Sequence, residues 1–244
     1  MNRLSAFSGR VLKEILRDPL DIGFGIGFPV VLMLLLSAIQ SNIPVALFEI
    51  AHLTPGIVIF GLSFLTLFSS LLIAKDRRSA LLHRLYTTPM RSPDFILGYT
   101  LPLIPLALAQ AAVCYLLAMI LGLVPTVQLL LVPVAIIPCA WFYISLGLLC
   151  GSALNDKQVG GVCGALLTNL SAWLSGTWFD LELVGGAFRK IAYLLPFVHA
   201  VDLLREAQSG TFAAALPHLL WVLGYSAAVT GAAVALFLRQ SRKV

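Results

Sequence analysis

Few residues of this chain have the types and spacing that chemistry requires. The candidates are four histidines and four cysteines, namely His52, His83, His199, His218, Cys114, Cys139, Cys150 and Cys163. They form no C-x-x-C or H-E-x-x-H pattern, and the chain has no G-x-S-x-G nucleophile motif. The cysteines all fall within long apolar runs, where cysteine is usually a small buried hydrophobe. We therefore predict no metal site and no catalytic site, and structural or interfacial roles for the histidines.

Glycine-rich stretches offer a second candidate chemistry, which is phosphate binding. The stretch "GFGIGF" at Gly23–Phe28 lacks the lysine and the strand of a phosphate loop, and no lysine of the chain follows a glycine. Small residues also allow membrane helices to approach closely. We favour that role here and for "GGVCG" at Gly160–Gly164, so no nucleotide site is expected.

The basic stretch "KDRRSALLHRLYTTPMR", Lys75 to Arg91, lies between two long apolar runs and holds five of the sixteen Lys and Arg residues. Asp76 is suited to capping a helix, and Pro89 disfavours helical geometry at Thr88. The apolar side of that helix would carry Ala80, Leu81, Leu82 and Leu85, and its charges would be Arg77, Arg78 and Arg84. Such a helix either lies on an anionic lipid surface or fills a groove on a cytoplasmic partner. Composition does not decide between the two.

The N-terminal segment, residues 1–20, has the same character. Leu4, Phe7, Val11 and Ile15 recur at helical spacing, and Arg3, Arg10, Lys13 and Arg17 lie along one flank. "RDP" at Arg17–Pro19 then ends the helix. We predict an amphipathic helix at the membrane surface.

The elements that must position these segments are membrane spans. Hydrophobic residues make up 59% of the 244 residues and charged residues 11%, whereas a soluble domain carries roughly 25% charged residues. Six apolar runs are long enough to cross a bilayer as helices: 22–40, 53–74, 95–121, 129–153, 159–178 and 216–238. The fold class is therefore an all-α polytopic membrane protein, a single transmembrane domain over 1–244.

Orientation follows from the Lys and Arg residues outside these runs. Thirteen lie in 1–21, 75–94, the 154–158 turn and the C-terminal tail, and three lie in the opposite connections, all within 179–215. Basic loops stay in the cytoplasm. Both termini are therefore expected in the cytoplasm and the 179–215 connection outside. The positive charge is explained by topology, so no nucleic-acid partner is expected.

None of the six runs contains Asp, Glu, Lys or Arg. Carriers driven by protons or sodium normally place ionisable groups in the membrane, and intramembrane enzymes need convergent catalytic groups. If the chain moves a substrate, another subunit must supply the energy.

The segment after the second run resembles the first cytoplasmic loop of type-2 ATP-binding-cassette (ABC) exporter permeases, whose pattern is D-R-E-x-G-x-L-E-R-L-x-x-T-P. Asp76, Arg77, Leu82, Arg84, Leu85, Thr88 and Pro89 match it, whereas Arg78, Ala80 and His83 depart from it. "RDP" before the first run also resembles the family. So does the outer stretch 174–205, through Leu174, Ser175, Gly176, Phe179, Ala192, Tyr193, Leu194, Pro196, Asp202 and Arg205; Asp180 stands where many relatives have proline.

This resemblance implies a multi-pass half-transporter of the bacterial cytoplasmic (inner) membrane. Two copies of the chain, as a homodimer, would enclose the path, and two copies of a cytoplasmic ATPase would bind ATP and magnesium. The chain itself would be no enzyme and would bind no cofactor. Contact with the ATPase is implied for Asp76, Arg77, Leu81, Leu82, Arg84, Leu85, Thr88 and Pro89 of the coupling helix, and for Phe7, Arg10, Val11, Glu14 and Arg17 of the interface helix. The 179–215 connection would be a re-entrant pair of short helices before the last span.

The substrate is expected to be hydrophobic or amphiphilic, a drug-like molecule or a lipid, as in multidrug efflux. The path would be lined by aromatic residues of the first, second and fifth spans: Phe24, Phe28, Phe64, Phe68, Trp173 and Trp178. Those side chains are equally suited to facing lipid or packing within the bundle. Two alternatives stay open, a permease for a polysaccharide or lipid-linked glycan and a scaffold subunit that transports nothing.

Overall fold

The computed structural model describes residues 3–43, 48–79 and 92–241, and these residues form helices and connections with no strand among them. The N-terminal part contains α1 (Arg3–Arg17), α2 (Pro19–Ile22), the π-helical η1 (Gly23–Gly27), α3 (Phe28–Asn42) and α4 (Ile50–Arg78). It continues with α6 (Ser92–Thr100), α7 (Leu103–Ile120), η3 (Val127–Leu131) and α8 (Val132–Ala153). The C-terminal part contains α9 (Asp156–Val159), η4 (Gly160–Leu167), α10 (Thr168–Leu174), α11 (Leu181–Val184), α12 (Gly186–Leu194), α13 (Pro196–Ser209) and α14 (Phe212–Ser241).

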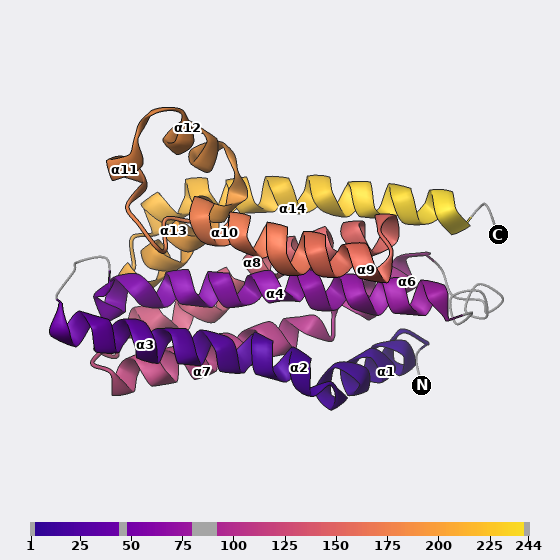
Figure 1. Cartoon of the computed structure of the whole chain (residues 1–244), viewed down its shortest axis with the longest axis horizontal. Helices are drawn as coiled ribbons and strands as arrows, with labels where there is room; N and C mark the ends of the chain where they lie inside the picture. The colour runs from indigo at the N-terminus through magenta and orange to yellow at the C-terminus, as the bar shows by residue number, and fades with distance from the viewer. Residues whose placement is uncertain (1–2, 44–47, 80–91, 242–244) are drawn as a thin grey trace.

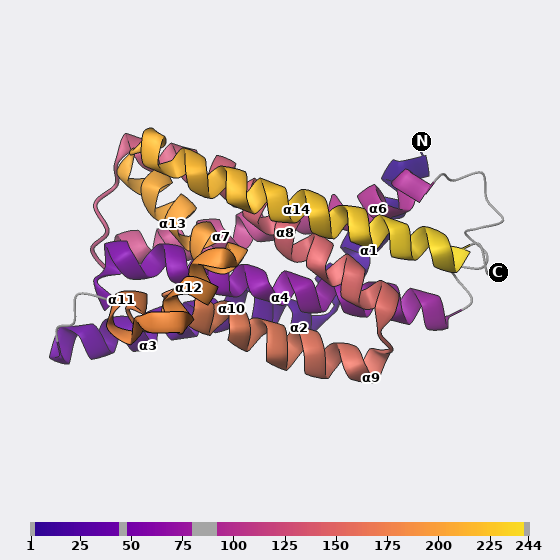
Figure 2. The ribbon, with the colours of Figure 1, turned by 90° about the horizontal axis from the view of Figure 1, so that it is seen from above.

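The long helices run side by side along one axis (Figure 1). The helix α1 and the last turns of α14 lie at one end of the bundle, and α11 and α12 lie at the other (Figures 1 and 2). We call these the inner end and the outer end, following the orientation predicted from the basic residues.

Five stretches of the described residues are long and apolar enough to cross a membrane: Gly23–Asn42, Ile50–Arg78, Asp94–Ile120, Val127–Ala153 and Phe212–Leu236. They coincide with five of the six predicted spans, so the chain is a multi-pass membrane protein. The predicted single span 95–121 is two helices, α6 and α7, because Pro102 interrupts it.

The sixth predicted span, 159–178, is not among these five stretches. The chain there is helical from Asp156 to Leu174 through α9, η4 and α10, and this run packs against α4. Its first turn is polar, with Asp156, Lys157 and Gln158, and it carries Asn169 midway. These residues lower its mean hydropathy below that of the other five helices.

The central helix of the bundle is α4, which packs against α3, α7, α8, α13 and η4. Its closest neighbour is α8, because Gly147 and Gly151 of α8 face the serines of α4. A Cβ at Gly147 would overlap the Oγ of Ser69, and one at Gly151 would lie 2.6 Å from the carbonyl oxygen of Ser70. Small residues thus allow the two backbones to meet, as is common between membrane helices.

The glycines singled out in the sequence contribute less to close packing than predicted. A Cβ at Gly25 would lie 3.0 Å from the ring of Phe68, and one at Gly164 would lie 3.4 Å from Leu67. A Cβ at Gly23, Gly27, Gly160 or Gly161 would meet nothing within 4 Å. Only two of these six glycines therefore lie where a side chain would touch another helix.

The 179–215 connection is helical, as predicted, but it contains three helices rather than two. The one-turn helix α11 precedes α12 and α13. Pro196 begins α13, where a missing N–H costs nothing, and Gly210 ends it at a φ of 83°. Because α13 packs against α4, α8 and α14 and buries Phe197, Val201 and Leu204, it lies within the bundle rather than on its surface.

Candidate coupling site and substrate path

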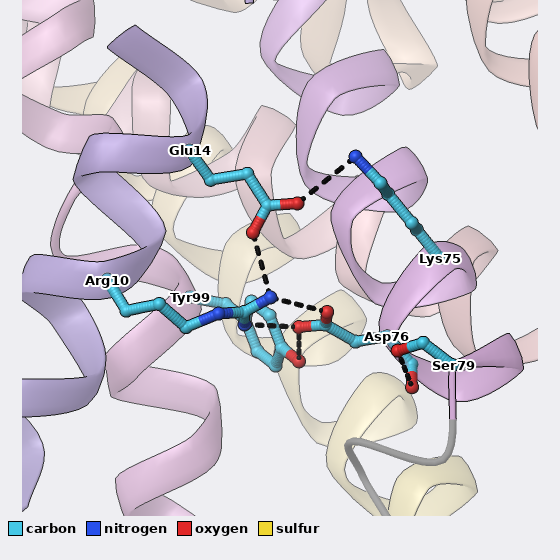
Figure 3. A network of polar contacts seen from close by, with 6 residues as sticks. All are labelled: Arg10, Glu14, Lys75, Asp76, Ser79 and Tyr99. Carbon is cyan, nitrogen blue, oxygen red and sulfur yellow. Dashed lines mark hydrogen bonds and ion pairs between the residues drawn. The ribbon is translucent and has the colours of Figure 1, made fainter. Parts of the chain in front are cut away.

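A charged network at the inner end joins α1, α4 and α6 (Figure 3). Asp76 of α4 is 2% exposed, and both of its carboxylate oxygens accept from Arg10 of α1, at 2.7 and 2.8 Å. The hydroxyl of Tyr99 on α6 donates to the same carboxylate at 2.7 Å. Glu14 accepts from Arg10 at 2.8 Å and pairs with Lys75 at 3.2 Å. A single buried carboxylate thus connects three helices.

The physical reason for this network is the cost of burying a charge. A carboxylate at the apolar end of a membrane helix is tolerated only when it is paired and its lone pairs are satisfied. A guanidinium meets that need because it donates two parallel hydrogen bonds. The hydrogen bond to Asp76 raises the pKa of Arg10, against the opposing effect of burial, and the charges of Asp76 and Glu14 raise it further.

The apolar side of α1 packs within the chain. The ring of Phe7 lies edge-on to Tyr99 at 5.0 Å and to Phe95 at 6.0 Å, above Gly98 of α6, whose missing Cβ leaves room for it. Val11 is fully buried, whereas Arg17 is exposed. The amphipathic helix is therefore where the sequence predicted it, and Phe7 contacts α6. A partner that docks on α1 meets its charged side.

Asp76 and Arg77 contact other helices of this chain, and their contact with an ATPase stays a prediction. Both belong to α4, which ends at Arg78, so the prediction that Asp76 caps the following helix is wrong. Arg10 binds the carboxylate of Asp76 within α4, and the helix continues beyond Asp76 to Arg78. Arg77 donates to the carbonyl oxygens of Gly151 and Ser152, at 2.8 and 2.6 Å, and so caps the end of α8.

The other predicted coupling residues, Leu81, Leu82, Arg84, Leu85, Thr88 and Pro89, lie outside the described residues. Two members of the network, Lys75 and Tyr99, were missed. Tyr99 could have been found from the sequence, because a tyrosine inside an apolar run needs a hydrogen-bond partner.

Most of the predicted path residues form one aromatic row between η1, α3 and α4. From the inner end, Phe68 stacks on Phe64 at 6.5 Å, Phe64 contacts Phe60 at 5.6 Å, and Phe60 contacts Trp178 at 5.5 Å. Phe24 and Phe28 lie beside Phe64 at 6.0 and 5.8 Å. The row therefore runs along α4 from its inner half to the connection after α10.

Trp173 does not belong to this row. Its side chain is 58% exposed, and no ring contact joins it to the other five predicted residues among the described rings. Phe60 was missed, although it precedes Phe64 and Phe68 at intervals of four residues and so shares their helix face. That spacing was sufficient to find it.

Each end of the row reaches a cavity. At the inner end a cleft of about 740 Å³ has a floor of Phe68, Leu71 and Leu72. Its rim carries charged residues of both signs, namely Arg10, Lys13, Glu14, Arg17, Asp18, Asp21 and Lys75. Burial, and then the neighbouring Asp18, raise the pKa of Asp21 to about 7. We call this space the inner cleft.

At the outer end a cavity of about 580 Å³ collects four of the five predicted signature residues, Gly176, Phe179, Asp202 and Arg205. We call it the outer cavity. Arg205 pairs with Asp202 at 3.2 Å and donates to the carbonyl oxygen of Gly176 at 3.4 Å, where a φ of 68° turns the chain after α10. The fifth, Pro196, begins α13 and does not line the cavity.

The comparison with protein families agrees with this architecture. The family model described as ABC-2 type transporter matches residues 2–209. The chain belongs to the ABC-2 type transporter family. A comparison with curated proteins finds no match. As an ABC-2 permease, the chain is the membrane component of an ABC transporter. This component works with an ATPase partner and has no nucleotide-binding site of its own.

The matched residues extend from α1 through α13 and include the charged network, the aromatic row and both cavities. The resemblance that the sequence motifs indicated is therefore confirmed.

Proposed function

We propose that the chain is the permease subunit of an ATP-driven exporter in a bacterial cytoplasmic membrane, and that its substrates are hydrophobic or amphiphilic molecules. Two copies would form the complete path, and two ATPase subunits, with their ATP and magnesium, would drive it. The observation that carries the proposal is the aromatic row joining the inner cleft to the outer cavity.

The path is argued from its lining. The inner cleft combines an apolar floor with a charged rim, which suits a molecule that lies at the membrane surface with its polar part outward. Phe68 belongs to both the cleft and the row, and Trp178 belongs to both the row and the outer cavity. A substrate that moved along α4 would thus exchange one aromatic contact for the next, without passing an ionised group.

Coupling to the ATPase is proposed to pass through the end of α4. The segment that follows Arg78 is the predicted coupling helix. Asp76 connects the end of α4 to α1 and α6, and Arg77 connects it to the end of α8. A displacement of this end would therefore move four helices together, because charge-assisted hydrogen bonds hold them.

The same proposal includes six spans with both termini in the cytoplasm, the sixth being the helical run Asp156–Leu174. It is supported by α1 and the last turns of α14 lying at one end of the bundle (Figure 1). A reporter fused at Gly185 is expected outside the cell, and one fused after Val244 inside. A cytoplasmic signal at Gly185 excludes the six-span topology.

Transport itself is tested with vesicles that contain the permease together with the ATPase found to copurify with it. We expect ATP-dependent movement of a lipophilic dye, lost when the ATPase or ATP is omitted. A complex that hydrolyses ATP but moves neither dyes, lipids nor lipid-linked glycans is a scaffold. A complex that moves only glycans refutes the proposed substrate class.

The coupling assignment is tested with Leu85→Asp. A carboxylate forced into an apolar groove on the ATPase costs several kcal/mol, and about 3 kcal/mol weakens docking more than a hundredfold. We therefore expect the variant to insert normally, to lose copurification of the ATPase and to lose transport.

The matched control is Arg78→Ala. Arg78 is 82% exposed and pairs with Asp156 at 3.1 Å, a surface pair that contributes less than about 1 kcal/mol. If the segment instead lies on anionic lipid, losing basic charge matters more than losing an apolar contact, and the effect fades in high salt. Normal ATPase copurification by Leu85→Asp disproves the coupling assignment.

A further inference from the structure

We propose that the outer cavity binds an amphiphilic organic cation, and that this is a site a substrate occupies before release. The proposal names a substrate class for the exporter described above, so the substrate role rests on that proposed function. Binding itself does not depend on transport. At about 580 Å³ the cavity has the size of sites that hold drug-sized molecules.

Aromatic side chains form much of its wall. Phe48, Trp178, Phe179 and Tyr193 all line the cavity, and they come from segments before α4, after α10 and in α12. The faces of aromatic rings carry negative charge and attract cations. Tyr193 already does so within the chain, since the guanidinium of Arg189 lies 5.7 Å from its ring centroid.

The charges of the wall favour the same ligand. Two carboxylates, Asp180 and Asp202, line the cavity, and the guanidinium of Arg205 is the one Lys or Arg charge among its lining residues. Arg205 is paired with Asp202, so the carboxylate of Asp180 is left as the excess charge. Asp180 is exposed and accepts the N–H of Glu182, which keeps its side chain at the start of α11.

These features distinguish a cation from the alternatives. An anion in this cavity would face two carboxylates and one guanidinium that is already paired. The Nε of Arg205 is buried without a partner among the described residues, and a neutral oxygen of the ligand would satisfy it. A neutral hydrocarbon would use the rings but gain nothing from the carboxylates. The wall therefore selects for positive charge on a hydrophobic body.

The test uses two probes of matched size and opposite charge, tetraphenylphosphonium and tetraphenylborate. Equilibrium binding of each radiolabelled ion to the purified full chain in neutral detergent is measured without ATPase. We expect saturable binding of tetraphenylphosphonium and none of tetraphenylborate. Binding of tetraphenylborate as tight as that of tetraphenylphosphonium, or no saturable binding of either ion, overturns the proposal.

Two substitutions locate the site, each with a neighbour as its control. Asp180→Asn keeps the cap of α11, since asparagine caps as well as aspartate, and should weaken tetraphenylphosphonium binding about threefold, as for an exposed charge pair. Glu182→Gln should not change it, because Glu182 lies two residues away, pairs with Arg189 and does not line the cavity.

Trp178→Leu should weaken binding about tenfold through the lost ring face, whereas Trp173→Leu, at the exposed tryptophan outside the cavity, should not. Equal losses within either pair overturn the proposal. Asp180→Asn keeps the test valid if Trp178→Leu fails to fold. Since no ATPase is present, a failure here leaves export untouched, and a failure of ATP-driven transport leaves the binding result standing.

Discussion

At the inner end the peripheral helix α1 is attached by charge, whereas at the outer end α12 and α13 are attached to α14 by rings. The inner attachment is the carboxylate of Asp76 held by Arg10 and Tyr99. The outer attachment is a pair of imidazoles, His199 and His218, whose Nδ1 atoms lie 2.8 Å apart. The inner attachment joins helices that are distant in the sequence, whereas the outer one joins the consecutive helices α13 and α14. The two attachments respond to different conditions.

The tautomers of the outer pair follow from its neighbours. The Nε2 of His199 lies 2.9 Å from the carbonyl oxygen of Tyr193, which only accepts, so this nitrogen carries the hydrogen. The Nδ1 of neutral His199 then accepts from the Nδ1–H of His218. The ring of His199 also stacks on Trp221 at 5.0 Å. The attachment is complete while His199 is neutral.

The difference indicates how each end is controlled. At the inner end, charge-assisted hydrogen bonds from Arg10 and a hydrogen bond from Tyr99 hold one buried carboxylate and so connect three helices. Burial lowers the pKa of His199, and the outer attachment needs this ring neutral, so the outer end is expected to weaken when acid protonates His199.

The strongest way to break the inner connection is Asp76→Asn. Arg10 loses its anionic partner and Tyr99 loses a charged acceptor. The free energy of unfolding should therefore fall by about 3 kcal/mol. This is the low end of the range for a broken buried pair, because the Arg10 side chain is 36% exposed. The midpoint of thermal unfolding in detergent and protease cleavage after α1 measure the loss. Asp156→Asn, at the exposed pair with Arg78, should cost less than about 1 kcal/mol. Equal costs for the two would show that burial of Asp76 contributes nothing.

A smaller effect, with a pH signature, is expected for His199→Gln. At neutral pH the free energy of unfolding should fall by about 1 kcal/mol, the contribution of one hydrogen bond. Burial, as the largest cause, lowers the pKa of His199, so the unfolded chain binds a proton that the folded protein excludes. Wild-type stability should therefore fall as pH drops below about 6.5, the ordinary histidine value, and His199→Gln should reduce that slope.

The histidine prediction has an internal control. Removing His218 breaks the same contact, so the double substitution should cost little more than either single one. Thermal unfolding of the three variants at pH 7.5 and 5.5 provides the comparison. Additive losses, or an unchanged pH slope in His199→Gln, would show that the two rings act independently.

The smallest effect sharpens the comparison at the inner end, where Asp21 is a carboxyl group with a raised pKa. Its pKa is raised to about 7, mainly by burial, so the folded protein keeps a proton that the unfolded chain releases near pH 4. Stability is therefore lost as pH rises from about 4 to 7. Asp21→Asn should remove this dependence and stabilise the chain at pH 8 by less than about 1 kcal/mol, since part of the side chain is solvated. A pH profile identical to wild type would contradict the assignment.

Several elements followed from local patterns. The apolar positions of α1 were predicted correctly because helical periodicity places Phe7, Val11 and Ile15 on one side whatever that side contacts. Five spans were found because hydropathy is additive along a helix. Five of the six aromatic residues expected to line a path contact one another in the aromatic row, whereas their role in a path stays a prediction. Phe60 was missed although its spacing was visible.

Other predictions failed where a long-range partner decided the outcome. The capping role of Asp76 was wrong because Arg10, 66 positions away, binds its carboxylate inside α4. The contact of Arg77 with the end of α8, 74 positions further on, was not predicted either. The break between α6 and α7 was underestimated, since a proline is tolerated in some membrane helices and ends others.

Composition and periodicity were enough to establish a helical membrane protein with an amphipathic N-terminal helix, because hydropathy and helical spacing are properties of adjacent residues. The resemblance of particular motifs, rather than composition, indicated the ABC-2 family. The connections between helices depended on the three-dimensional fold. Which guanidinium neutralises Asp76, which imidazole meets His199 and which side chains surround the outer cavity are set by packing between distant segments, where the cost of an unpaired buried group selects one partner from many.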